Sequence, residues 1–138
     1  MGGIENAIYP WGNEGLSYND HKANLWQGSF PYYNSNLDGH EITAPIKSFK
    51  ANGYGLFDMA GNVWEYCQDA YSESSYERHW KESTVENPLM ENATEKDHVI
   101  RGGSFLCNAS YCAGYRTSRR MYSTASHDHV RFRCVRDN

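Results

Sequence analysis

The first half of this chain shows no regular alternation of hydrophobic and polar positions. In residues 1–50, Gly, Pro and Asn recur between isolated aromatic residues, and no helical spacing of apolar residues is sustained. These residue types interrupt helices and strands, so the region is predicted to consist of loops with isolated extended pieces. A short extended run is expected at residues 45–46, before the turn dipeptide Asn52-Gly53.

Residues 55–67 carry the first strong pattern. Residues 56–59 are compatible with one helical turn, which Gly61-Asn62 would end. Residues 63–67 combine Val, Trp and Tyr, a composition typical of a strand. We therefore expect a helical turn followed by a short strand.

The second half alternates polar stretches with short apolar ones. Residues 71–97 are polar and predict a surface excursion, with a helical turn around residues 74–81. Residues 98–105 are typical of a strand that ends in a glycine pair, and residues 113–120 are a candidate for another strand.

Apolar and basic residues alternate with a period of two at the end of the chain. This alternation predicts a half-buried strand. Val130, Phe132 and Cys134 would face the core, and Arg131 and Arg133 would face away. Together, the segments indicate one α+β domain over residues 1–138, loop-rich and with little regular structure.

Composition narrows the possible functions. A length of 138 residues suits one domain, and 11 Tyr, 5 Phe and 4 Trp can supply a core where aliphatic residues are few. A net charge of −4 gives no electrostatic reason to expect nucleic acid as a partner. No apolar run approaches the ~18 residues of a membrane span. No signal peptide is visible, which predicts a cytoplasmic protein if Met1 is the native start.

Cys107 and Cys112 are the most informative candidates for chemistry. Their C-x4-C spacing differs from that of zinc knuckles and of thioredoxin-like redox motifs. Three interpretations are open: a disulfide that closes a small loop, two thiolate ligands of one soft metal, or inert core thiols. Thiolates select Cu(I), and a positive neighbour such as Arg116 or Arg120 would favour the deprotonated form. For Cys67 and Cys134, a disulfide bridge and two buried free thiols are equally compatible with the sequence.

Three motifs lie at residues 53–66, 99–105 and 132–134. Together they resemble the sulfatase-modifying-factor superfamily. The stretch Arg101-Gly-Gly-Ser-Phe-Leu-Cys-Asn-Ala-Ser-Tyr-Cys-Ala-Gly-Tyr-Arg is more specific and is similar to formylglycine-generating enzymes. Tyr9-Pro-Trp-Gly and residues 23–31 also fit that branch. The resemblance covers nearly the whole chain, but family members usually carry a further N-terminal part.

The resemblance implies a copper-dependent oxidase on a C-type-lectin-like fold. Cys107 and Cys112 would bind Cu(I), and a cysteine in a Cys-x-Pro-x-Arg segment of a substrate protein would become the third sulfur ligand. Dioxygen would then convert that cysteine to formylglycine. The resemblance also assigns active-site positions to Ser104, Tyr111, Trp64 and Arg120. Many members have His where this chain has Asn108, which cannot relay a proton near neutral pH.

The resemblance further implies two Ca²⁺ sites. One would use the side chains of Asn24 and Asp38 with the carbonyls of Leu25 and His40. The other would use the side chains of Asp58 and Glu65 with the carbonyls of Gly61 and Val63. Oxygen ligands suit a hard cation, although turn and capping roles would also explain these side chains.

Two alternatives concern the whole protein. A non-catalytic ligand-binding module on the same fold would not need the C-x4-C pair, so the pair discriminates between the two functions. A second chain that supplies the usual N-terminal half is a further expected partner.

Overall fold

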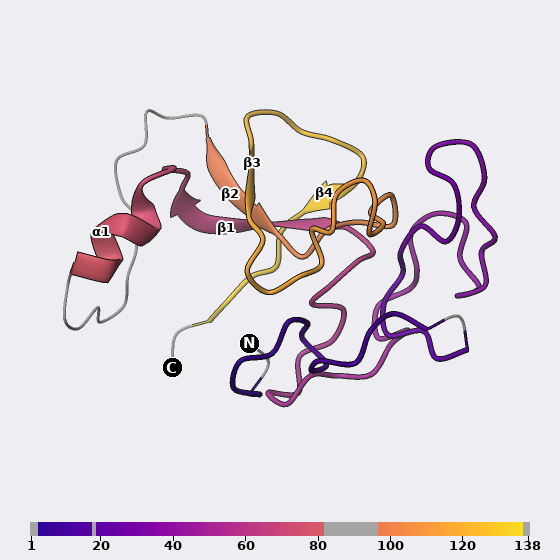
Figure 1. The fold of residues 1–138 in the computed structure, drawn as a ribbon. Helices are drawn as coiled ribbons and strands as arrows, with labels where there is room; N and C mark the ends of the chain where they lie inside the picture. Colours follow the sequence, from indigo (N-terminus) through magenta and orange to yellow (C-terminus); the bar gives the residue numbers. More distant parts are fainter. Residues whose placement is uncertain (1–2, 18, 82–96, 137–138) are drawn as a thin grey trace.

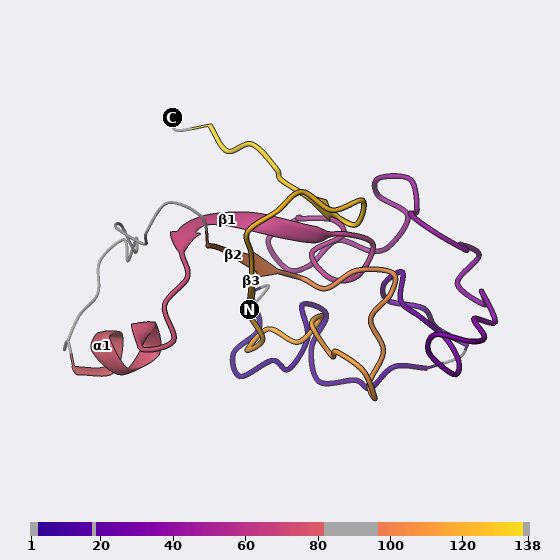
Figure 2. The same ribbon diagram turned by 90° about the horizontal axis from the view of Figure 1, so that it is seen from above.

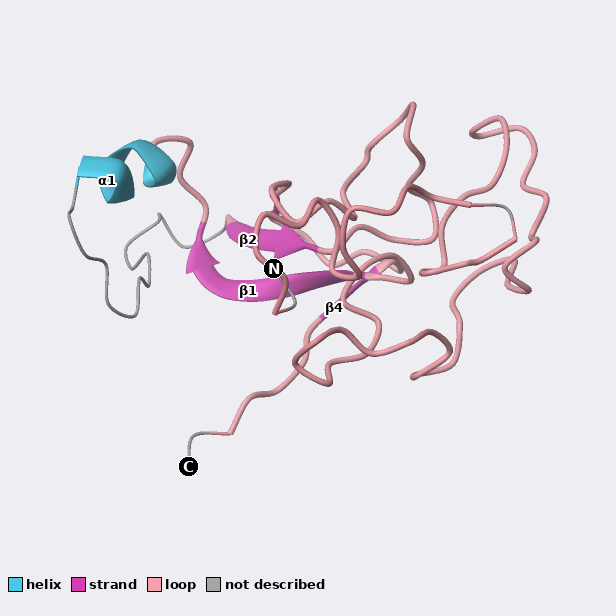
Figure 3. Cartoon of the chain, turned by 60° about the horizontal axis from the view of Figure 1, so that its bottom comes forward, coloured by secondary structure: helices cyan, strands magenta, loops and turns pink. Residues whose placement is uncertain are grey.

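A computed structural model describes residues 3–17, 19–81 and 97–136. Most of the described chain forms loops and turns, as Figure 3 shows. Its regular elements are β1 (Trp64–Ala70), α1 (Ser75–Lys81), β2 (His98–Arg101), β3 (Met121–Ser123) and β4 (Val130–Arg131). The expected loop-rich mixture of a small sheet and little helix is therefore confirmed.

The strands form one mixed sheet in the order β3-β2-β1-β4. β1 pairs antiparallel with β2 and parallel with β4, while β2 pairs antiparallel with β3. Figures 1 and 2 both show the sheet between α1 at one end of the molecule and the loops of the N-terminal half at the other. The sheet thus lies between α1 and the loops of the N-terminal half.

The predicted strand at 63–67 and the predicted helical turn at 74–81 correspond to β1 and α1. The strand expected at 98–105 is confirmed as β2, which stops before the glycine pair. Gly102 and Gly103 have φ of 90° and 74°, a left-handed backbone that a strand cannot continue through.

The core is small and lies where the sheet meets the cysteine loop. Trp64 of β1 and Ile100 of β2 pack with Tyr115 and Cys107, and Tyr9 joins them from the N-terminal loops. Tyr9 and Tyr115 stack with ring centroids 5.9 Å apart. Large rings, together with small aliphatic residues, therefore fill the interior.

Two expected elements are absent from the described residues. Residues 56–59 form no helical turn, because Asp58 has a φ of 54° and its carboxylate accepts a hydrogen bond from the backbone of Lys47. Residues 113–120 form turns, because Thr117 bonds the distant backbone of Ile8.

The predicted C-terminal strand is also shorter than expected. β4 contains only two residues, and both pair with the first residues of β1. Phe132 is 73% exposed and Cys134 is exposed, so the predicted burial of these two side chains is wrong. The central part of the expected polar excursion, residues 82–96, lies outside the described residues. No helix in the described ranges is long and apolar enough to cross a membrane.

Candidate functional site

Cys107 and Cys112 form a disulfide, with their Cα atoms 5.3 Å apart. Cys107 is 2% exposed and belongs to the core, whereas Cys112 packs at its edge and is partly exposed. The structure therefore shows the first of the three interpretations of the pair. It also brings together the two sulfur atoms that a shared metal would need.

The other two cysteines are free, so the proposed Cys67–Cys134 bridge is wrong. Cys67 lies in β1 and is half-buried, and its burial raises the pKa of the thiol above the ordinary value. Cys134 is exposed, so only part of the alternative prediction, two buried free thiols, agrees with the structure.

Asn108 stabilises the loop between the paired cysteines through several hydrogen bonds. Its side-chain oxygen accepts hydrogen bonds from the backbone of Ser110 (3.1 Å) and Tyr111 (2.8 Å). Its carbonyl accepts from the backbone of Cys112 (3.1 Å) and Ala113 (3.0 Å). An Asn that bonds backbone groups two and three residues ahead stabilises a turn. These bonds hold the loop independently of the disulfide.

The predicted residues Ser104 and Trp64 lie in the same core as the pair. Ser104 is 1% exposed, and its carbonyl accepts from the backbone of Cys107 at 2.9 Å. Trp64 packs so closely on Gly114 that a Cβ there would lie 2.3 Å from the indole ring. Trp64 therefore packs directly against the backbone that follows Cys112, and its predicted role in the site stays a prediction.

Tyr111 is placed at the surface beside the pair, but Arg120 is held elsewhere. Tyr111 is 63% exposed and stacks on Phe30 with centroids 4.2 Å apart. The Arg120 guanidinium lies over the rings of Tyr71 (4.8 Å) and Tyr76 (4.5 Å). The described contacts of Arg120 thus tie it to α1 and the end of β1, away from the cysteine loop.

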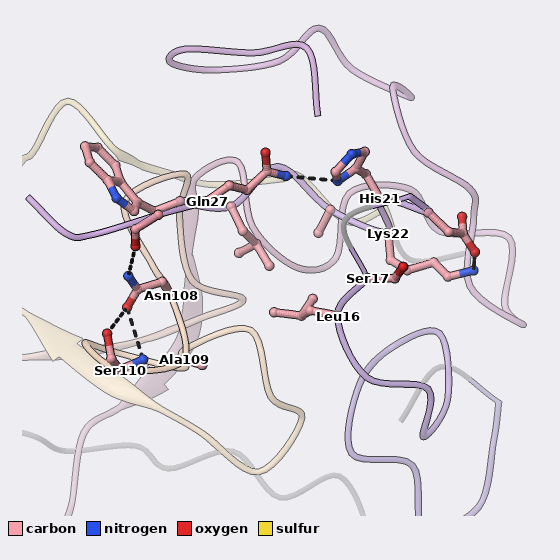
Figure 4. Close-up of a pocket in the computed structure, with 13 residues that line it drawn as sticks. Leu16, Ser17, His21, Lys22, Gln27, Asn108, Ala109 and Ser110 are labelled. Carbon is pink, nitrogen blue, oxygen red and sulfur yellow. Dashed lines mark hydrogen bonds and ion pairs between the residues drawn. The ribbon is translucent and has the colours of Figure 1, made fainter. Parts of the chain in front are cut away.

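A cavity of about 290 Å³ is lined in part by residues 108–110 of the cysteine loop. Figure 4 shows Asn108 and Ser110 on one side of it and His21 and Lys22 on the opposite side. Gln27 spans the wall and bonds the His21 ring at 2.9 Å. The cavity mixes apolar and polar lining, which is typical of a small-ligand site.

The residues of the first predicted calcium site lie together. The two Asp38 oxygens accept hydrogen bonds from the backbone of Leu25 (3.2 Å) and His40 (3.1 Å). Asn24 is 1% exposed and donates to Ile42 and to the side chain of Asn62. The oxygen-rich donor set fits a hard cation, but the same contacts also give Asp38 the role of a turn residue.

Two residues of the second predicted calcium site, Glu65 and Asp58, accept hydrogen bonds from the guanidinium of Arg133. Nε of Arg133 donates to Glu65 at 2.7 Å, and Nη2 donates to the other oxygen of the same carboxylate. The guanidinium also donates to the carbonyls of Phe57 (3.2 Å) and Asp58 (3.5 Å). The hydrogen bond with Glu65 raises the pKa of Arg133, so the arginine remains charged.

Asp58 has one partnered and one unpartnered oxygen. Oδ2 accepts from the backbone of Lys47 at 2.6 Å, while Oδ1 is buried without a hydrogen-bond partner in the described structure. A buried, unpartnered carboxylate oxygen is costly and fits a cation ligand. Within residues 3–17, 19–81 and 97–136, no three His, Cys, Asp or Glu side chains gather as a metal cluster, so either calcium site would depend on amide and carbonyl oxygens.

The sequence profile of the sulfatase-modifying factor enzyme 1-like domain family matches residues 1–138. The chain belongs to this family. A formylglycine-generating enzyme of Thermomonospora curvata is 42% identical over 138 residues, covering 99% of this chain and 45% of that protein. An inactive C-alpha-formylglycine-generating enzyme 2 of Bos taurus is 32% identical over 140 residues, covering 97% of this chain and 39% of that protein.

The structure of PvdO from Pseudomonas aeruginosa shares the fold of this member of the sulfatase-modifying factor family. Its TM-score is 0.62 at 24% identity, with 91% of this chain and 42% of that chain covered. The likeness confirms a formylglycine-generating-enzyme-like fold. This chain spans less than half the length of each of these three relatives.

Two features of the site were missed by sequence reasoning. Arg133 was expected to face away from the core, yet it binds the Glu65 carboxylate. Asn108 was considered only as a substitute for His, yet it organises the turn between the cysteines. Asn side chains often accept hydrogen bonds from the backbone two or three residues ahead and so stabilise turns, and this signal could have revealed the role of Asn108.

Proposed function

We propose that this family member carries the metal-binding and oxidising site of a formylglycine-generating oxidase. The observation that supports it most is the pairing of Cys107 and Cys112 at the edge of the core, in a chain 42% identical to a formylglycine-generating enzyme. The substrate would be a protein segment of the Cys-x-Pro-x-Arg type. Its cysteine would become formylglycine, with dioxygen as the oxidant.

The active form of the pair would be the reduced dithiol. A cuprous ion bound by both thiolates would supply the capacity to activate dioxygen, because soft sulfur ligands select Cu(I). The sulfur of Cys107 would lie on the buried side of the bound ion. Cys112 is partly exposed, and a substrate thiol would approach the ion from its side. Trp64 and Ser104 would keep bulk water away from the buried side.

The electron balance requires a reductant. Conversion of the substrate –CH₂SH group to –CHO with release of H₂S removes two electrons from the cysteine. Dioxygen takes four electrons as it forms two oxygen atoms at the level of water, one of which becomes the aldehyde oxygen. Two further electrons would come from an added thiol, which would also open the Cys107–Cys112 disulfide.

Mass spectrometry of a Cys-x-Pro-x-Arg peptide tests the activity. The peptide would be incubated with Cu(I)-loaded, thiol-reduced protein in air, and the aldehyde trapped with a hydrazide. We expect conversion by the unmodified protein, none by Cys107→Ser or Cys112→Ser, and full conversion by the matched control Cys67→Ser. Equal conversion by all four proteins would exclude the pair as the reactive site.

The same variants test copper binding without turnover. Anaerobic titration of the reduced proteins with Cu(I), against a competing chelator, should give one tight site in the unmodified protein and in Cys67→Ser. Loss of the tight site in either variant of the pair supports shared ligation. A weak response of equal size in all proteins argues against a metal site.

A non-catalytic ligand-binding module on a C-type-lectin-like variant of this fold is the second candidate. The cavity between Asn108 and His21 supports it, because a binding site needs an enclosed mixed surface but no thiolate pair. Ligand binding that persists in Cys112→Ser, together with no aldehyde from any protein, would favour this candidate.

The proposed cofactors and partners complete the hypothesis. Ca²⁺ would occupy the sites of Asp38 and Asp58, where it would stabilise loops that have little regular structure. The relatives carry more than half of their length outside the matched region. A segment that corresponds to this unmatched part of the relatives, supplied by a longer chain or by a second chain, would cover apolar side chains such as Ile46, which is 85% exposed. Co-purification of this protein with a polypeptide similar to the unmatched part tests this partner.

A further inference from the structure

A second cavity, of about 460 Å³, lies beside the end of β2. Arg101 and Gly102 line it from β2 and the glycine pair, and residues 115–118 line it from the turns that follow the cysteine loop. Pro10 and Met59 add apolar side chains from the N-terminal half. The lining residues in the described part of the chain include neither cysteine of the pair and none of the predicted calcium ligands, so this cavity is separate from those sites.

Arg101 brings to this cavity a positive charge that no bonded carboxylate neutralises. It is half-buried, and its guanidinium donates to two neutral acceptors, the carbonyl of Thr117 (2.8 Å) and the hydroxyl of Tyr76 (3.0 Å). Glu65 lies opposite Arg101 in the sheet, but Arg133 engages both oxygens of that carboxylate. Charged groups that are partly removed from water are usually paired, so the position favours an incoming anion.

Arg116 adds a second positive charge to the same lining. Its side chain is exposed, and neither Arg116 nor Arg101 forms a salt bridge within residues 3–17, 19–81 and 97–136. Burial raises the pKa of the Tyr115 phenol, and the charge of Arg116 opposes that rise, so the guanidinium lies near this ring. Two guanidinium groups without bonded carboxylates thus border one cavity, and no Asp or Glu is among its described lining residues.

The chemistry of the lining matches an organic acid. A guanidinium presents several N–H donors in a planar fork, and Arg101 uses only some of them in its bonds to Thr117 and Tyr76. Such a fork fits the two oxygens of a carboxylate. The side chains of Pro10 and Met59 can pack against an apolar group, and a cavity of this size suits a small organic molecule.

We propose that this cavity binds an organic carboxylate, with the acid group at Arg101 and Arg116 and the apolar body against Pro10 and Met59. The two charges attract the anion, and the apolar side chains select acids that carry a hydrophobic group. The site goes beyond the oxidation of a cysteine, because it needs neither copper nor the thiol pair.

NMR titration of the whole chain with phenylacetate tests the site. This probe joins one carboxylate to one aromatic ring, and it should shift mainly the backbone amides of Gly102 and residues 116–118. Acetate has the same charge but no ring, and it should bind about tenfold more weakly. The uncharged 2-phenylethanol keeps the ring and should also bind about tenfold more weakly, because it cannot pair with the guanidinium groups.

Variants at two neighbouring arginines identify the binding group. Arg116→Gln removes one charged donor group and should weaken phenylacetate binding about five- to tenfold. Arg119→Gln is the matched control, because it removes the same charge from an exposed residue that is not among the lining residues. Its affinity should stay within about twofold of the unmodified protein. Arg116→Lys keeps the charge but loses the planar fork, so its affinity should lie between those of Arg116→Gln and the unmodified protein.

The outcomes decide between a specific site and general attraction to a basic surface. Weaker binding in Arg116→Gln but not in Arg119→Gln, with both the ring and the charge of the probe required, supports the site. Equal phenylacetate affinity in these two variants overturns it, as does equal binding of acetate and phenylacetate. The amide spectrum of each variant reports whether it is folded. Formylglycine formation is measured separately and is decided by the cysteine variants.

Discussion

The contact between Trp64 and Gly114 makes a quantitative prediction about packing in the core. A Cβ at residue 114 would lie 2.3 Å from Cη2 and 2.7 Å from Cζ2 of the indole ring. Trp64 is 5% exposed and packs among core residues, so the ring could move aside only by displacing its neighbours. Because overpacking costs about 1–3 kcal/mol and two ring atoms are overlapped here, Gly114→Ala should destabilise the protein by about 2–3 kcal/mol.

A double-mutant cycle identifies the cause. Trp64→Phe removes both overlapped atoms, so Gly114→Ala should cost about 1–2 kcal/mol less in that background. Urea unfolding of the four proteins measures the coupling. Gly15→Ala is the control, because a Cβ there meets nothing within 4 Å, and its change should stay within about 0.5 kcal/mol. Additive effects of the two core substitutions would refute the steric argument, as would a neutral Gly114→Ala.

Three further outcomes are expected. Reduction of the Cys107–Cys112 disulfide should lower the unfolding free energy by about 2 kcal/mol, because the bond closes a short loop. Urea unfolding with and without reductant measures this change, and an unchanged unfolding midpoint would contradict the prediction. Arg120→Ala should increase amide exchange in α1 several-fold, because each lost cation–π contact is worth about 0.5–1 kcal/mol; exchange equal to that of an exposed arginine variant would argue against this anchor. The raised pKa of the half-buried Cys67 keeps its thiolate fraction low. At pH 8, iodoacetamide should therefore modify Cys134 well before Cys67, and the Cys67 rate should rise about tenfold per pH unit below its pKa.

The sequence was sufficient to predict the strands whose local pattern agrees with their packing in the core. β1 and β2 carry apolar residues that reach the core, and the glycine pair after β2 ends the strand through backbone conformation alone. The cysteine pair was recognised from its spacing and from the residues around it. Its state was left open, because neighbouring sulfurs can be bonded or can share a metal.

Contacts between distant residues decided the regions that were predicted wrongly. Residues 56–59 have a local composition suitable for a helical turn, but the bond between Asp58 and Lys47 fixes a left-handed backbone instead. Residues 113–120 follow a path set by Ile8, more than one hundred positions earlier. The alternation at residues 130–134 forms a strand only at Val130–Arg131, and beyond that strand the Arg133 guanidinium hydrogen-bonds Glu65, Phe57 and Asp58. Such partners cannot be read from a local pattern.

The Asn108 turn has a consequence for how the cysteine loop responds to reductant. Its amide and carbonyl oxygens, which accept from Tyr111 and Cys112, do not depend on the sulfur–sulfur bond. When the bond opens, the two thiols should therefore stay neighbours instead of drifting apart. An incoming soft ion would meet a chelate that is already assembled, so little chain entropy remains to be lost when it binds.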